Sequence, residues 1–495
     1  MSNAIIRHLT EVLLFAGIAM LVPAAYALWA GEKTVAALLL PAAIMILPGL
    51  PRLAKNTHAF AHTSLADAWR RIKGRPVESR PWNFAYSLLT LEFVKHRDET
   101  ALSSYQAIVV SALAWIIVPA ICMIPYLALG YSPADSAFES MSGWTTTGLS
   151  TIPFPENLPS SIVFYRSFMQ WIGGVGIIIF ALIVMRAPAA SELFRAEGHE
   201  GIEFGIRKTV NRIWLIYLLL SIVGAALLCA AGMTLFYSVN ITMATISTGG
   251  FLPSSDTAFS LFQKIGMIAI MIAGATSFAM HSEILQRKWA SVMRNTEFKL
   301  MLAVIALFSS AVFFTGVRPE NALFFATAAT STAGLTIENL GLLGDLAKYL
   351  LVLLMIAGGT SGSTAGGVRM WRIALLFKSL RAKIRAQFLP PGAVQPIKVN
   401  GRVMTQDQLA ESGSFIFLYS AVVLAGSAAL MATDMKSMDA FFSVASAMGN
   451  VGLATLDMGA LPQAGKWLLT LVMYIGRIEI LPGLVLIKFL KDGGR

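Results

Sequence analysis

Four short segments of the chain share a pattern of residues suited to binding a desolvated monovalent cation. Each begins with an apolar residue and ends ten positions later in a glycine that small residues precede; the segments are 138–148, 239–249, 324–334 and 442–452. Backbone carbonyls can replace the hydration shell of such an ion. Glycine adopts, at little cost, the positive φ that turns successive carbonyls toward one axis. The pattern therefore predicts a carbonyl-lined cation filter.

We assign the last three residues of each segment to the filter: Thr146, Thr147 and Gly148; Ser247, Thr248 and Gly249; Thr332, Ala333 and Gly334; Asn450, Val451 and Gly452. One copy alone would more simply be a helix contact, because small residues are common where membrane helices touch. Four copies, each between two apolar runs, favour another interpretation. Backbone that is not helical lies at membrane depth only where protein surrounds it or where it lines a watery cavity. Four equivalent segments can surround one axis, which predicts a pore.

A run of ten small residues interrupts the apolar stretch at 346–378. It consists of Gly358, Gly359, Thr360, Ser361, Gly362, Ser363, Thr364, Ala365, Gly366 and Gly367. Five glycines make a continuous helix unfavourable here. We predict a broken helix whose middle obstructs the ion path below the filter and acts as a gate. The alternatives are a close helix-packing surface and a flexible linker outside the membrane.

Arg477 is a charged residue near the middle of the last apolar run, 11 residues from both Lys466 and Lys488. Such a charge costs about 2.5–3.5 kcal/mol on insertion scales, so it must be hydrated or paired. Glu479 lies nearly opposite around the helix and is not the natural partner. Arg477 either faces the ion path, where it limits cation passage or meets the gate, or forms a buried ion pair between helices.

The composition places these segments in an integral membrane protein. Of 495 residues, 56% are hydrophobic and 13% are charged, whereas soluble chains carry about 25% charged residues. This composition therefore argues against a soluble enzyme, a nucleic-acid binder and a disordered scaffold. The apolar runs contain no set of nucleophile and base and no set of metal ligands, so we expect neither an enzyme nor a bound cofactor.

Ten apolar runs are candidates for crossing the membrane, since about 20 residues span its hydrocarbon core. They lie near 9–30, 35–50, 104–129, 161–185, 212–236, 260–284, 297–317, 346–378, 412–432 and 466–490. The second run is short and contains Pro41 and Pro48, so it can be tilted or partly irregular. The first run also resembles a signal peptide with a cleavage site at Ala25-Tyr26-Ala27.

The distribution of basic residues predicts the orientation in the membrane. Of the 38 Lys and Arg residues, 30 lie in the termini and in the loops at 52–97, 186–212, 287–299 and 369–402. The alternate loops hold only Lys33, Arg166, Lys264, Arg318, Lys348, Lys436 and Lys466. The positive-inside rule then places both termini and the four basic loops in the cytoplasm.

Six motifs carry a resemblance to a known family. They are Met141-Ser-Gly-Trp-Thr-Thr-Thr-Gly148-Leu-Ser, Gln170-Trp-Ile-Gly-Gly-Val-Gly176, Ser247-Thr-Gly-Gly-Phe251, Ser331-Thr-Ala-Gly-Leu335, Gly358-Gly-Thr-Ser-Gly-Ser-Thr-Ala-Gly-Gly367 and Gly476-Arg-Ile-Glu479. Over about residues 90 to 490 the chain resembles the bacterial Trk/Ktr potassium-uptake family, in particular its TrkH/TrkG-type membrane subunits.

The resemblance implies an all-α polytopic membrane protein. Four pseudo-repeated units of helix, re-entrant pore loop and helix would surround one central pore, with two extra N-terminal helices. The corresponding division is 1–90 for the N-terminal helices and a basic cytoplasmic loop, 91–200, 201–294, 295–400 and 401–495 for the four pore repeats. The third repeat contains the broken second helix.

The resemblance also implies the cargo and the partners. We expect K⁺ as the transported ion, held at the filter and nowhere else. We also expect a homodimer, a cytoplasmic nucleotide-binding ring of TrkA type and a place in the bacterial inner membrane. Serine in place of the first filter glycine accompanies Na⁺ permeation in related plant transporters, and this chain has glycine in all four segments. The alternative is an H⁺- or Na⁺-coupled K⁺ secondary transporter with alternating access, which usually needs a buried carboxylate such as Glu479.

Overall fold

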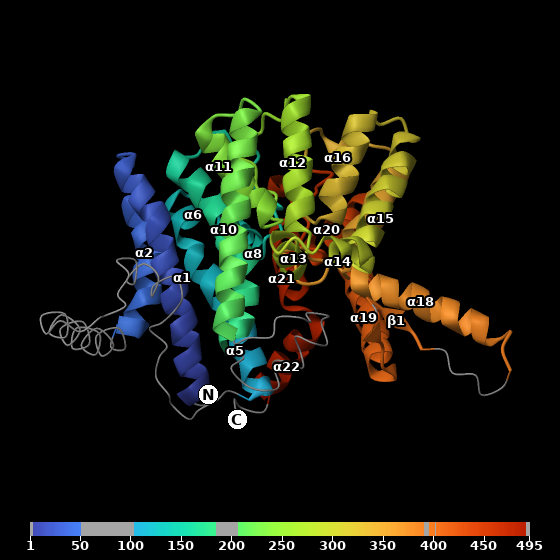
Figure 1. The fold of residues 1–495 in the computed structure, drawn as a ribbon. Coiled ribbons are helices and arrows are strands. Elements are labelled where there is room, and N and C mark those ends of the chain that lie inside the picture. The colour runs from blue at the N-terminus through green and yellow to red at the C-terminus, as the bar shows by residue number, and fades with distance from the viewer. Residues whose placement is uncertain (1–2, 51–102, 185–205, 391–395, 401, 492–495) are drawn as a thin grey trace, which may run out of the picture.

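The computed structural model describes residues 3–50, 103–184, 206–390, 396–400 and 402–491 (Figure 1). This part of the chain consists of helices and turns, apart from one hairpin of two-residue strands, β1 (Lys398–Val399) and β2 (Arg402–Val403). The all-α fold class is confirmed. The predicted basic loop at 52–97 and residues 186–205 of the next basic loop lie outside the described residues.

Two helices at the N-terminus pack against each other as a hairpin beside the main body (Figure 1). They are α1 (Asn3–Trp29) and α2 (Val35–Ile46), and the 3-10 turn η1 (Leu47–Gly49) continues the second helix. α2 has 12 residues, which at about 1.5 Å per residue is too short to cross the membrane upright. We call α1, α2 and the turn between them the N-terminal hairpin.

Four units of one design follow the hairpin, each with a first helix, a short pore helix and a second helix. The first helices are α5 (Ser104–Cys122) continued by α6 (Ile124–Ala128), α10 (Ile206–Ala230), α15 (Thr296–Phe313) and α19 (Gln406–Met431). The pore helices are α7 (Pro133–Trp144), α11 (Leu235–Ile246), α16 (Pro319–Thr330) and α20 (Ser437–Met448). The second helices are α8 (Ser160–Val184), α12 (Leu261–Gly274), α17 (Asp345–Ala357) and α21 (Gln463–Ile478). Each pore helix has 12 residues.

The four units close into a ring. Each pore helix packs on the second helix of the preceding unit: α11 on α8, α16 on α12, α20 on α17, and α7 on α21. The last of these contacts joins the fourth unit back to the first. The predicted arrangement of four pseudo-repeats around one centre is therefore confirmed.

Some predicted spans are continuous helices and others are broken. In the described part of the chain, five helices are long and apolar enough to cross a membrane: 4–29, 105–128, 209–230, 296–313 and 406–431. Two further candidates are bent pairs. α12 meets α13 (Phe278–Leu285) at 104°, and α21 meets α22 (Ile480–Lys491) at 107°. The predicted run at 346–378 is α17, a helix-free stretch, and α18 (Met370–Ala386).

Short elements connect these helices. The 3-10 turns η3 (Pro155–Asn157), η4 (Leu340–Leu342) and η5 (Met458–Ala460) precede the second helices of three units, and α14 (Trp289–Arg294) joins the second unit to the third. The pore helices and the adjoining parts of the second helices form the buried core. The interior of the protein is thus built around the predicted filter segments.

Candidate ion filter and gate

Each pore helix ends in the same tight cap. Its second residue beyond the helix has positive φ: 56° at Thr146, 55° at Thr248, 55° at Thr332 and 50° at Asn450. Such a left-handed residue is usually glycine, because a side chain costs roughly 1–2 kcal/mol there and a β-branched one is a genuine outlier. Three β-branched threonines in this conformation indicate strain at a functional position. We call residues 145–148, 247–250, 331–334 and 449–452 the filter strips.

The caps point four carbonyls away from their own pore helices. The third N–H of each strip donates back into the helix: Thr147 to Ser142 at 2.9 Å, Gly249 to Ala244 at 2.7 Å, Ala333 to Ala328 at 3.1 Å, and Val451 to Ser446 at 2.9 Å. In a trans peptide the preceding carbonyl points the opposite way. The carbonyls of Thr146, Thr248, Thr332 and Asn450 therefore face away from their pore helices.

The fourth residue of each strip packs directly on the next strip. Gly148, Gly250, Gly334 and Gly452 all have positive φ. A Cβ atom on any of them would lie 2.5 Å or less from the carbonyl oxygen of the next strip's third residue: Gly249, Ala333, Val451 and Thr147, respectively. Real Cβ atoms essentially never approach closer than 3.0 Å. The strips form a closed ring of four, and no side chain fits at these four positions.

This ring corrects the predicted register in the second segment. The sequence pattern gives Ser247, Thr248 and Gly249, whereas the structural equivalent of Gly148 is Gly250. Buried methionines confirm the structural register, since Met169, Met271, Met355 and Met473 each follow the fourth glycine of a strip by 21 residues. Ser247 begins its strip, and Gly249 contributes the carbonyl that faces Gly148.

The structure places the other predicted filter residues close together. Thr146, Thr147, Thr332, Ala333, Asn450 and Val451 are all buried within the ring of strips. The side chains of the four residues with positive φ form hydrogen bonds to groups outside their own pore helices. Asn450 Nδ2, for example, donates to the carbonyl of Met473 at 3.0 Å. These contacts keep strained residues in place.

The small-residue segment, 358–367, lies against three of the four strips. Thr248 Oγ1 donates to the carbonyl of Thr364 at 2.9 Å, and the N–H of Gly366 donates to Thr332 Oγ1 at 2.9 Å. A Cβ on Gly366 would collide with the carbonyl of Gly449, so the segment also touches the strip of the fourth unit. The segment therefore adjoins three of the four strips.

A second helix break receives this segment. Between α12 and α13 the helix bends, which frees the carbonyls of Gly274 and Ala275. Thr360 donates its N–H and its hydroxyl to Ala275, at 3.1 and 2.8 Å. Thr364 Oγ1 lies 3.0 Å from the carbonyl of Gly274 and 2.9 Å from that of Ile246. Backbone groups freed inside a membrane must form hydrogen bonds with protein. Here the carbonyls freed at the bend between α12 and α13 accept hydrogen bonds from the small-residue segment that lies between α17 and α18.

A buried carboxylate fixes the middle of the segment. Glu297, in the first turn of α15, accepts a hydrogen bond from the N–H of Ser361 at 2.8 Å, and the N–H of Phe278 donates to Gly362 at 2.9 Å. Ser363 Oγ donates within the segment, to Thr360, at 2.6 Å. The alternative of a flexible linker outside the membrane does not fit a segment that hydrogen bonds hold in the core.

Arg477 reaches from the end of α21 to the first unit. Its Nη1 donates to Thr146 Oγ1 at 3.2 Å, and its Nη2 donates to the carbonyl of Gly173 at 2.7 Å. The guanidinium carbon lies 5.2 Å from the ring centre of Trp115. Among the described residues, no carboxylate forms a salt bridge with Arg477. The predicted alternative of a buried ion pair is therefore not found in this part of the chain.

Glu479 instead joins two helix breaks. Its Oε1 lies 3.5 Å from Arg369 Nη2 and its Oε2 lies 3.3 Å from Arg372 Nη2. Arg369 precedes α18 and Glu479 precedes α22, and both have positive φ. The guanidinium of Arg372 also stacks over Phe415 at 3.9 Å. The broken second helices of the third and fourth units are thus tied together by charge.

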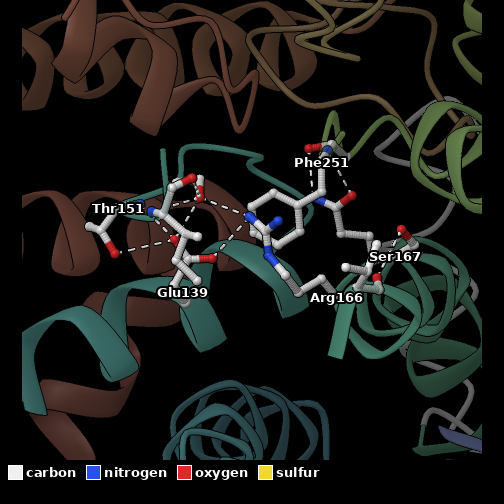
Figure 2. A network of polar contacts seen from close by, with 10 residues as sticks. Glu139, Thr151, Arg166, Ser167 and Phe251 are labelled. Atoms are coloured by element: carbon white, nitrogen blue, oxygen red, sulfur yellow. Dashed lines mark hydrogen bonds and ion pairs between the residues drawn. The ribbon is translucent and has the colours of Figure 1, made fainter. Parts of the chain in front are cut away.

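A buried charge network behind the first strip was missed by the sequence analysis (Figure 2). Arg166 Nη2 lies 3.2 Å from Glu139 Oε2, and both side chains are buried. Glu139 Oε1 accepts from the N–H of Thr151 at 2.6 Å. The guanidinium of Arg166 stacks 4.2 Å from the ring centre of Phe251, between the first two units (Figure 2). The charge count wrongly treated Arg166 as a loop residue, although it lies within α8.

Gln170 connects α8 to the second strip. Its Nε2 donates to the carbonyl of Gly249 at 2.7 Å, and its Oε1 accepts from the N–H of Phe251 at 3.1 Å. Gln170 belongs to one of the six motifs that carry the family resemblance, but the motif does not predict which residue Gln170 contacts. Gln170 thus holds one carbonyl of the ring.

Comparisons with known proteins agree with this geometry. The sequence model of the TrkH family, described as cation transport protein, matches residues 82–315 and 316–493. An uncharacterized cation transporter of Methanocaldococcus jannaschii is 35% identical over 395 residues, which cover 78% of this chain and 82% of that protein. The Trk system potassium uptake protein TrkH of Escherichia coli K12 is 29% identical over 421 residues, which cover 79% of this chain and 86% of that protein.

A solved structure is similar along nearly the whole chain. The crystal structure of the potassium transporter TrkH from Vibrio parahaemolyticus matches with a TM-score of 0.78 and 26% sequence identity. The match covers 98% of both chains. It therefore includes the N-terminal hairpin and all four units.

Proposed function

The chain belongs to the TrkH family of cation transport proteins, and we propose that it passes K⁺ through the ring of filter strips. Its family of cation transporters also means that it is not an enzyme. K⁺ as the cargo is supported by the potassium uptake and potassium transporter names of the relatives. The proposal makes K⁺ the substrate that the protein moves and gives the chain no resident cofactor.

The closed ring of glycine-to-carbonyl contacts carries the proposal. Four carbonyls at the level of Thr146, Thr248, Thr332 and Asn450 can replace water around a desolvated cation without the trapping strength of a carboxylate. The pore helices end at the same level, so the negative ends of their dipoles add attraction for a cation. The proposed filter residues are those predicted from the sequence, with Gly250 added to the second strip.

The small-residue segment and Arg477 form the proposed gate. The segment touches the strips of the second, third and fourth units, and Arg477 touches that of the first unit. A cation leaving the strips at their inner end would meet both. We propose that conduction requires the segment to leave its site at the bend between α12 and α13.

The assembly and orientation follow the family expectation. We propose a homodimer in the bacterial inner membrane, with both termini cytoplasmic and a nucleotide-binding ring of TrkA type docked on the cytoplasmic side. The division into an N-terminal region and four pore repeats, at 1–90, 91–200, 201–294, 295–400 and 401–495, is part of the same proposal.

Coupled secondary transport is the competing function. It needs a titratable carboxylate on the ion route. Glu479 is engaged by two arginines, whereas Glu297 is buried against the proposed gate. Glu297 is therefore the residue through which proton coupling would act.

Flux into liposomes tests these two functions against each other. Purified protein is reconstituted, and uptake of K⁺, Rb⁺ and Na⁺ is followed with a membrane voltage alone and with an added pH gradient. We expect K⁺ and Rb⁺ uptake on voltage alone, and uptake that does not depend on the pH gradient in either the wild type or a Glu297→Gln variant. Uptake that needs the pH gradient and stops in Glu297→Gln would establish the coupled transporter instead.

A further inference from the structure

Three of the four seams between neighbouring units carry the same polar contact. At each, a lysine near the start of a second helix reaches the pore helix of the next unit. Lys264 Nζ donates to Asn321 Oδ1 at 2.9 Å, Lys348 Nζ lies 3.2 Å from Asp439 Oδ1, and Lys466 Nζ lies 2.6 Å from Asp135 Oδ1. We call these contacts the seam lysine contacts.

The seam lysine contacts occupy one register. Each lysine follows the fourth glycine of its own strip by 14 residues, and each partner precedes the fourth glycine of the next strip by 13 residues. Lys348 and Lys466 are both only 7% exposed. Breaking a buried pair by removing one partner is strongly destabilising, because a charge remains without compensation. These contacts therefore fix each pore helix to the preceding unit.

The seam between the first and second units lacks a seam lysine contact. The equivalent positions are Ile162, which is fully buried, and Tyr237. The connecting loops do meet nearby, where the N–H of Ser255 donates to Glu156 Oε2 at 2.8 Å, but both residues are exposed. α8 and α11 pack against each other here, but the polar contact from a lysine to the next pore helix is missing at this seam.

The N-terminal hairpin lies on this seam instead. The ring of Tyr26 stacks on Phe164 of α8, with centroids 5.1 Å apart, and on Phe236 of α11, with centroids 6.2 Å apart. Glu32, in the turn after α1, accepts hydrogen bonds from the N–H of Ser161, at 3.2 Å, and from its hydroxyl. A carboxylate at the N-terminus of α8 also complements the helix dipole. Tyr26 thus touches both units, and Glu32 fixes the start of α8.

α8 transmits this contact to the filter. Gln170, on the same helix, donates to the carbonyl of Gly249, which is the oxygen that faces Gly148 in the ring. Gly148 leaves no free space at this contact, so a shift of α8 relative to α11 must move that carbonyl. The position of α8 therefore sets the geometry between the first two strips.

We propose that the N-terminal hairpin replaces the missing seam lysine contact, with Glu32 and Tyr26 as positioning residues for the cation filter. The proposal rests on the proposed function, because it assigns these residues to the selectivity of the same ring. In this proposal the hairpin stabilises the seam between the first and second units, in addition to anchoring the chain in the membrane. This is the one seam of the ring that has no seam lysine contact.

The ratio of K⁺ to Na⁺ flux in liposomes tests the proposal. Combining Glu32→Ala with Tyr26→Ala should lower this ratio about five-fold, which corresponds to about 1 kcal/mol. Lys348→Met at an intact seam should lower it similarly. Glu11→Gln removes a carboxylate of α1 that pairs with Arg7 and His8 on the same helix, 15 residues before Tyr26, and should leave the ratio unchanged. An unchanged ratio in the double variant would overturn the proposal.

A designed seam lysine contact provides the decisive variant. Adding Ile162→Lys and Tyr237→Asp to the hairpin double variant builds the missing contact and should restore most of the ratio. A ratio that stays low would mean that Glu32 and Tyr26 act in another way and would refute the replacement. If the double variant does not fold, Glu32→Gln alone takes its place, and an unchanged ratio there would also refute it.

Thermal stability separates this proposal from the proposed function. Wild-type protein without K⁺ preference would contradict the proposed function but not the fastening of the seam. In that case the melting temperature of the detergent-solubilised protein should still fall in the hairpin variant and rise again with the designed pair. A melting temperature unaffected by either change would reject the fastening itself.

Discussion

Replacing Thr360 and Thr364 with valine should raise the basal cation flux of the protein without any cytoplasmic partner. Both hydroxyls hold the small-residue segment on the carbonyls freed at the bend between α12 and α13, at 2.8 Å from Ala275 and 3.0 Å from Gly274. Thr364 Oγ1 also lies 2.9 Å from the carbonyl of Ile246 in α11. Valine has the same shape and lacks the donor. The backbone N–H bonds from the same two residues remain, so the segment should loosen without loss of the fold.

The size of the effect follows from the hydrogen bonds that are lost. A buried hydroxyl-to-carbonyl bond contributes about 1 kcal/mol net, and each loss should therefore shift the balance between docked and undocked segment about five-fold. If the two sites act independently, the double variant should shift it about thirty-fold. Flux should rise by these factors as long as the docked state predominates in the unmodified protein.

The assay is Rb⁺ uptake into liposomes driven by voltage, normalised to the amount of folded protein. Ser363→Ala is the matched control, because its hydroxyl bonds within the segment and not to the bend. It should leave the flux close to that of the unmodified protein. Equal flux in the valine variants and the control, or lower flux in the valine variants, would refute the gate assignment.

Three further results are expected. Arg477→Gln removes the charge next to Thr146 and should raise cation conductance in single-channel recordings, while loss of folded protein instead would mark Arg477 as purely structural. Glu139→Gln leaves the buried Arg166 without a charged partner and should lower the free energy of unfolding by roughly 3 kcal/mol. Thermal or denaturant unfolding measures this change. A change within about 0.5 kcal/mol, as is usual at a surface site, would contradict a stabilising role of the Glu139–Arg166 network. Burial raises the pKa of Glu32, but hydrogen bonds from Ser161 and its neighbours outweigh this and hold the pKa below its usual 4.5. The carboxylate therefore stabilises the fold above pH 4.5. The melting temperature of the wild type should exceed that of Glu32→Gln there, and the difference should disappear as the pH falls through the lowered pKa. A constant difference in melting temperature from about pH 3 to 7 would contradict this prediction.

The position of the left-handed caps was predictable in three units because the caps need particular residues. A phenylalanine ten positions before the last glycine marks the register in the first, third and fourth segments. In the second segment that position is Asn240, and counting from Val239 led to Gly249 instead of Gly250. Two adjacent glycines are equally able to adopt positive φ, so only the closure of the ring decides between them.

The helix break at the small-residue segment was predictable from its glycines, but the contacts of the segment were not. The segment binds to the carbonyls of Gly274 and Ala275, which a bend between α12 and α13 frees. The sequence at this bend contains no proline and no charged residue from which the bend could be predicted. The Glu139–Arg166 pair was missed for a related reason. A charge count treats a basic residue in an otherwise weakly basic region as a loop position, and a partner 27 residues away in sequence is visible only in the fold.

The most direct test of the central claim is to locate a heavy K⁺ substitute, Rb⁺ or Tl⁺, by anomalous scattering in crystals of the protein. The account predicts a peak on the central axis, with oxygen ligands from all four strips at the level of Thr146, Thr248, Thr332 and Asn450. Peaks away from the strips, or a site that involves fewer than four of them, would contradict a four-part carbonyl filter.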